Sequence, residues 1–73
     1  MTSQQYQALS LRAKAQAYQT TQPIAQKNWL NTYKSLALQA ILQIEQETKQ
    51  DVTLLAQEVY GKFAVAMREL NLF

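Results

Sequence analysis

The sequence predicts an all-α protein of two or three helices that form an antiparallel helical bundle by oligomerisation. Apolar side chains recur every three or four residues from Leu30 to Ile44 and again from Val52 to Phe73, which is the spacing of one helix face. Only Thr48 holds this phase across the polar gap between them. The composition is helical, with one glycine, one proline and many Ala, Leu, Gln and Lys residues. A chain of 73 residues forms one domain at most, so we expect a single helical domain over 1–73.

The low stability expected of so short a chain is a further observation that predicts oligomerisation. A domain of this size buries only about 60% of its unfolded surface and is marginal alone. The chain has no cysteine for a disulfide and no histidine, the commonest metal ligand. Association between chains is the remaining way to stabilise the fold, and a homodimer is the form we favour.

The first helix is expected over about residues 2–20. Thr2 and Gln5 have the spacing of a capping box. The apolar residues form two weak stripes instead of one strong face. One stripe is Tyr6, Leu9, Ala13 and Ala17, and the other is Leu11, Ala15 and Tyr18. Two such stripes fit a helix that lies between two neighbours, or a marginal helix that orders on binding.

A second helix is expected over about residues 23–46. Proline disfavours helix in the residue before it and fits the first turn of a helix, so Pro23 marks the break and the new start. The first turns of this helix carry Trp29, Leu30 and Tyr33, which begin a broad apolar face.

Residues 45–51 leave two interpretations open. Thr48 and Asp51 have capping-box spacing, which predicts a turn and a third helix over about 49–71. Glu45 and Lys49 form an i,i+4 pair, and the apolar phase continues through this segment, which favours one continuous helix. Such a helix from 30 to 73 would be about 66 Å long and would need a partner helix in a coiled-coil pairing. We favour the continuous helix slightly.

Large apolar residues on this face are the candidate contacts with a partner or a second copy. They are Trp29, Tyr33, Ile41, Ile44, Val52, Leu55, Val59, Phe63 and Leu70. Four basic and no acidic residues precede residue 45, and three basic and five acidic residues follow from there, so the net charge changes from +4 to −2. This asymmetry favours antiparallel self-pairing.

Catalytic side chains are not indicated by any motif. The usual nucleophile and base pairs need Cys or His, and the chain has neither. Glu45 and Glu47 are two residues apart and point to different sides of a helix. We therefore expect no catalytic residue, no cofactor, no metal site and no enzymatic activity. The expected function is that of a helical protein–protein interaction module, such as an adaptor, regulatory subunit or assembly factor.

Nucleic-acid binding through the basic N-terminal half is the alternative. Aromatic residues that could stack on bases lie near four basic residues, and a helix–break–helix surrounds Pro23. The basic residues are Arg12, Lys14, Lys27 and Lys34. They are sparse, so we rank this function second. The apolar run Ser35 to Ile44 is far shorter than the roughly 18 residues of a membrane span, and no signal peptide is indicated. We expect a cytoplasmic protein without a membrane partner.

Overall fold

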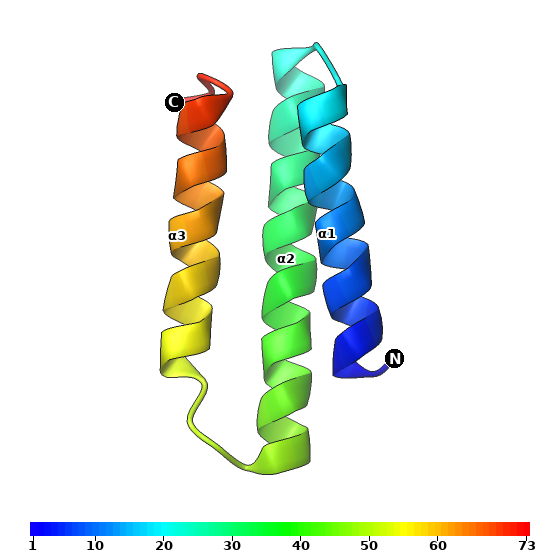
Figure 1. Ribbon diagram of the computed structural model, residues 1–73, viewed down its shortest axis with the longest axis vertical. Helices are drawn as coiled ribbons and strands as arrows, with labels where there is room; N and C mark the ends of the chain where they lie inside the picture. The colour runs from blue at the N-terminus through cyan, green and yellow to red at the C-terminus, as the bar shows by residue number, and fades with distance from the viewer.

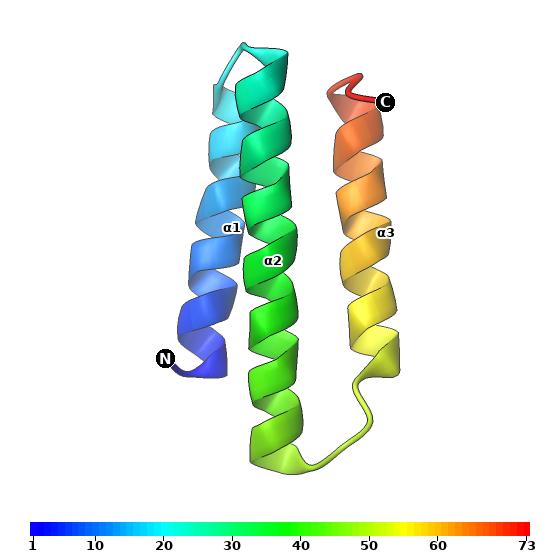
Figure 2. The ribbon, with the colours of Figure 1, turned by 180° about the vertical axis from the view of Figure 1, so that it is seen from behind.

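The computed structural model describes residues 1–73 and contains three helices and no strand. Helix α1 spans Ser3–Gln19, α2 spans Pro23–Thr48 and α3 spans Thr53–Glu69. This confirms the all-α class and the interpretation with three helices. In Figure 1, α2 lies between α1 and α3, and each helix runs in the opposite direction to the one before it. The reverse view in Figure 2 shows the same order, with the two termini at opposite ends of the molecule.

Helix α1 begins with the predicted capping box. The backbone N–H of Gln5 donates to Oγ1 of Thr2 at 3.2 Å, and the backbone N–H of Thr2 donates to Oε1 of Gln5 at 2.8 Å. The residues that α1 buries are small: Ser10, Ala13 and Ala17. Because small side chains separate helices little, α1 packs closely along α2.

Helix α2 begins at Pro23, as predicted. Its N-cap residue, Gln22, makes no side-chain capping bond. The side-chain amide of Gln26 instead donates to the carbonyl of Thr20 at 2.9 Å. This bond ties the first turn of α2 back to the end of α1 and closes the short link between them.

The continuous helix that we favoured is wrong, because α2 ends at Thr48. The next residue, Lys49, has φ 59° and ψ 24°, the left-handed conformation that commonly terminates a helix. Its backbone N–H still donates to the carbonyl of Glu45 at 2.8 Å. The chain then turns back, so that α3 packs against α2 of the same chain (Figure 1).

The residues expected to form a capping box at this turn bond differently. The Thr48 hydroxyl donates to the carbonyl of Ile44 at 2.8 Å, back along α2. Oδ1 of Asp51 accepts from the backbone N–H of Thr53 at 3.0 Å and from its hydroxyl at 2.6 Å. The N-cap of α3 is Val52, which has no side-chain capping bond. Asp51 therefore organises the turn from one residue before the cap.

Two small clusters of buried side chains form the core. The first contains Ala13, Tyr33, Ala37, Ile41 and Val59. The second contains Ala17, Leu30, Ala66 and Leu72. Only 11 of the 73 residues are buried. The accessible surface of 5120 Å² exceeds the roughly 4,600 Å² typical of a monomer of this mass. The molecule is flat, with extents of 39 × 21 × 12 Å, and much apolar surface remains exposed.

Candidate functional site

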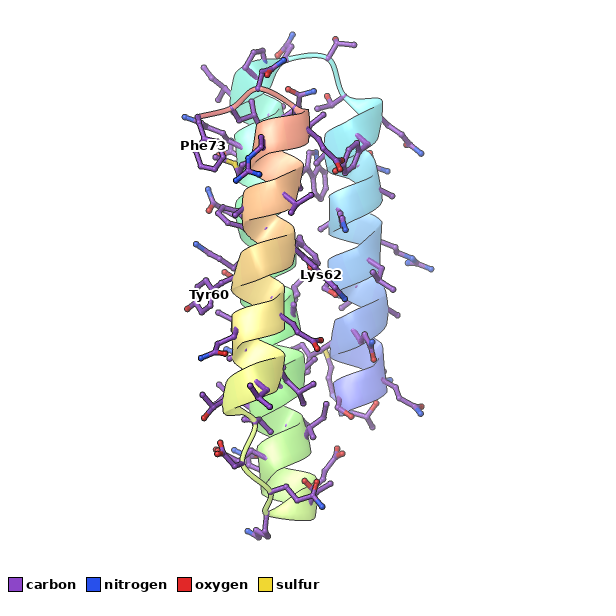
Figure 3. All side chains as sticks on the ribbon, turned by 60° about the vertical axis from the view of Figure 1, so that its left-hand side comes forward. Tyr60, Lys62 and Phe73 are labelled. Carbon is purple, nitrogen blue, oxygen red and sulfur yellow. The ribbon has the colours of Figure 1, made fainter.

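An open groove separates α1 from α3. Both helices flank α2, yet no Cα atom of α1 lies within 8 Å of a Cα atom of α3. Two adjoining hollows, of about 400 Å³ and about 160 Å³, occupy the space between them. Glu58 and Lys62 of α3 line both hollows, and the two hollows together are called the α1/α3 groove. Figure 3 shows the Lys62 side chain in the space between α3 and α1.

The floor of the groove is apolar and comes from α2. It consists of Tyr33, Ala37, Ala40, Ile41 and Ile44. Leu11 of α1 and Leu55 of α3 form opposite walls above this floor. Leu11 is 57% exposed and Leu55 is 40% exposed. The chain thus leaves two leucine side chains in water on either side of an apolar channel.

The rim of the groove carries charges of both signs. Lys14 and Lys62 line it together with Glu58 and Glu69. The Nζ atom of Lys14 lies 5.5 Å from the centre of the Tyr33 ring, a cation–π distance. Burial raises the pKa of the Tyr33 hydroxyl. An apolar floor beneath a charged rim is the arrangement that an amphipathic helix can enter.

One end of the groove is closed by a contact between α1 and α3. The Tyr18 hydroxyl donates to Oε2 of Glu69 at 2.5 Å. This hydrogen bond, followed by partial burial and the charge of Glu69, raises the pKa of Tyr18 to about 12. The buried cluster around Leu30 and Ala66 lies at the same end. Side chains from all three helices therefore meet at this end.

The candidate interface residues fall into three groups. Tyr33, Ile41 and Val59 are buried together in the first core cluster, so they are already covered within one chain. Ile44, Val52, Phe63 and Leu70 are half-buried. Trp29 and Leu55 are exposed. Leu55 and Ile44 line the groove, whereas Trp29 lies in a separate hollow between α1 and α2 with Leu9.

Several groove residues were not among the candidates. They include Leu11, Tyr18, Glu58, Lys62 and Val65. The second weak stripe of the first helix contains Leu11 and Tyr18, and it indicated a second neighbour for that helix. Glu58, Lys62 and Val65 of α3 gave no comparable signal. Figure 3 also shows Tyr60 on the edge of α3 away from α1, and Phe73 at the C-terminal end.

The basic side chains of the N-terminal half do not share one surface. Lys14 lines the α1/α3 groove, whereas Arg12 lines the hollow that contains Trp29. The Nζ atom of Lys34 lies 4.5 Å from the centre of the Phe63 ring, on the α2–α3 side. This dispersal does not favour the continuous basic surface that contacts with phosphates need.

No three His, Cys, Asp or Glu side chains lie close enough together to hold a metal ion. None of the three helices combines the length and apolar character needed to cross a membrane. In comparisons with known proteins, no family model matches the chain, and no curated protein or solved structure matches it significantly.

Proposed function

We propose that the protein is a non-enzymatic helical interaction module that acts as a homo-oligomer, with a dimer as its basic unit. The observation that supports this most is the small core, because only 11 of the 73 residues are buried and large apolar side chains such as Leu11, Leu54 and Leu55 stay exposed. Covering apolar surface contributes roughly 25 cal/mol per Å², so this exposed apolar surface favours association. The chain has no cysteine through which a disulfide could stabilise it instead.

The groove is proposed as the surface that this module presents to another protein. A helix is about 10 Å across, and one lying between α1 and α3 would complete a group of four around the α2 floor. Such a ligand would place apolar residues against Ile44, Leu11 and Leu55. Charged residues at its flanks would meet Lys62 and Glu58. An adaptor, regulatory subunit or assembly factor in the cytoplasm would use this surface.

Sedimentation equilibrium at micromolar concentration tests self-association. We expect a reversible dimer whose fraction rises with protein concentration. A folded monomer over the whole concentration range would overturn the proposal of a homo-oligomer.

Matched variants test the groove as a surface for a different protein. Leu11→Glu places a charge on the groove wall, and Leu42→Glu places one on an exposed residue that does not line the groove. Both residues are about half exposed, so neither change buries a charge. A partner that uses the groove would bind the wild type and Leu42→Glu but not Leu11→Glu. Equal binding of all three proteins would exclude the groove.

A further inference from the structure

We propose that two copies join by exchanging α3. In this dimer the loop between α2 and α3 straightens, and α2 and α3 become one helix. The α3 segment of each chain then packs on α2 of the second copy, where its own α3 packs in the single chain. The inference rests on the self-association proposed above and specifies how the two copies combine.

The register of the residues that meet across α2 and α3 is the first argument. Ile41 and Val59 lie in one buried cluster, and in a continuous helix they would be about five turns apart. Leu30 and Ala66 share the second cluster, and they would be about ten turns apart. Whole numbers of turns place both members of each pair on the same side of a continuous helix.

The Lys34 and Phe63 pair follows the same rule. The Lys34 ammonium lies over the Phe63 ring, and the two residues would be about eight turns apart in a continuous helix. Two identical antiparallel helices can satisfy such pairs twice, once on each side of a two-fold axis. The exchanged dimer requires the apolar positions before and after residues 45–51 to lie on one face of a continuous helix, and the sequence keeps that phase. A hairpin does not require it.

The loop that would straighten is short, and the backbone conformation at one of its residues is energetically unfavourable. It contains four residues, 49–52, between the end of α2 and the start of α3. Lys49 holds a left-handed backbone conformation, with φ 59°, that residues with a side chain seldom adopt. The N-cap Val52 provides no side-chain acceptor. Straightening would relieve Lys49 and pair the backbone groups left open at the two helix ends. Short hinge loops under strain favour such exchange.

The attachment of α3 within one chain is the third argument. Only Val59 and Ala66 of its 17 residues are buried. Its Cα atoms approach α2 but not α1. Releasing α3 therefore breaks few packed contacts, and the second copy restores all of them because the residues involved are the same.

The exchanged dimer would keep the α1/α3 groove in each half. Each groove would have α1 and α2 from one chain and α3 from the other. Tyr18 would then donate its hydrogen bond to the partner's Glu69. The joined helix over 23–69 would be about 70 Å long, so the two grooves would lie at opposite ends of an elongated molecule.

The distance between two sites on one chain tests the exchange. Lys27 and Arg68 are exposed, and they lie near the start of α2 and in the last turn of α3. Those two helix ends lie side by side in the single chain (Figure 1). In the joined helix they would be about 60 Å apart. The chain has no cysteine, so Lys27→Cys with Arg68→Cys accepts two nitroxide labels without background labelling. Pulsed electron resonance then measures their separation.

The labelled chain is unfolded and refolded with an excess of unlabelled wild type, so that intrachain distances dominate the signal. A second pair, Asn31→Cys with Arg68→Cys, repeats the test with an expected distance of about 55 Å. Sedimentation of the same samples gives the oligomeric state. A dimer with the long distances supports the exchange. A dimer with only short distances overturns the exchange and leaves self-association intact. A monomer overturns both proposals.

Discussion

The Tyr18 hydroxyl donates a 2.5 Å hydrogen bond to Oε2 of Glu69, which links α1 to α3 at one end of the α1/α3 groove. The two residues lie 51 positions apart in the chain. Farther along the groove, Leu11 of α1 and Leu55 of α3 both line its apolar part. The contact between Tyr18 and Glu69 therefore sets where the groove closes.

Alkaline pH should weaken the fold through this contact. Tyr18 has a pKa of about 12 in the folded chain, against the ordinary value of 10.0. Between these values the unfolded chain loses a proton that folded Tyr18 keeps, so the free energy of unfolding falls as pH rises. Urea denaturation at several pH values measures this slope. Because the pKa of Tyr33 is also raised, Tyr18→Phe should reduce the slope without abolishing it. An unchanged slope in Tyr18→Phe would contradict the assignment.

Leu30→Ala should destabilise the chain strongly. Leu30 is the largest side chain with no exposed surface, and truncating a buried leucine costs about 2–5 kcal/mol. Since small domains have little stability in reserve, we expect much of the protein to unfold at room temperature. Circular dichroism during urea denaturation measures the loss. Leu54→Ala is the control, because Leu54 is 74% exposed and should change stability by less than about 0.5 kcal/mol. Equal effects of the two changes would contradict the core described above.

Gly61→Ala should stabilise the protein. Gly61 lies within α3, and a Cβ atom added there would meet no other atom within 4 Å. Alanine in a helix interior is favoured over glycine by about 0.5–1 kcal/mol. The midpoint of thermal unfolding should rise accordingly. A lower midpoint would show that another chain approaches the α3 backbone at Gly61, since nothing within the chain would obstruct the methyl group.

Lys49→Gly should shift the protein from dimer to monomer. Glycine adopts the left-handed conformation of position 49 readily, which removes about 1 kcal/mol of strain from the loop of the single chain. Glycine also disfavours the joined helix of the exchanged dimer by about 1 kcal/mol. Both effects weaken dimerisation, and sedimentation equilibrium measures the change in the dissociation constant.

The control for this change is Asn71→Gly. Asn71 also has a positive φ, of 56°, but it lies beyond α3 and outside the loop that straightens. Its substitution should leave the dissociation constant unchanged. If Lys49→Gly and Asn71→Gly behaved alike, the straightening of the loop would not control association.

Local signals in the sequence predicted the starts of the first two helices well. Thr2 and Gln5 form their capping box, and Pro23 opens α2, because each start depends on a few adjacent residues. The turn at 49–52 was harder to predict. The apolar phase through residues 45–51 and the pair of Glu45 and Lys49 both favoured a continuous helix. The structure instead ends α2 with Lys49 in the left-handed conformation.

The candidate site was predicted only in part. Periodicity identified apolar residues such as Ile41 and Ile44, but it could not show which of them are buried in the core and which line the groove. That distinction depends on how far α3 stands from α1, which is a property of the packed helices. Lys62 shows the difficulty, because its type and position resemble any exposed residue on a helix. Only the arrangement in space places it inside the groove.

Small-angle X-ray scattering over a range of concentrations tests most directly whether the chain associates through an exchanged α3. The single chain has a longest extent of 39 Å and a Cα radius of gyration of 12.6 Å. The exchanged dimer contains a helix of about 70 Å, so both quantities should rise well above these values as the concentration increases. A scattering profile that stays at the single-chain dimensions at every concentration, or a dimer whose longest extent falls well short of about 70 Å, would contradict the account.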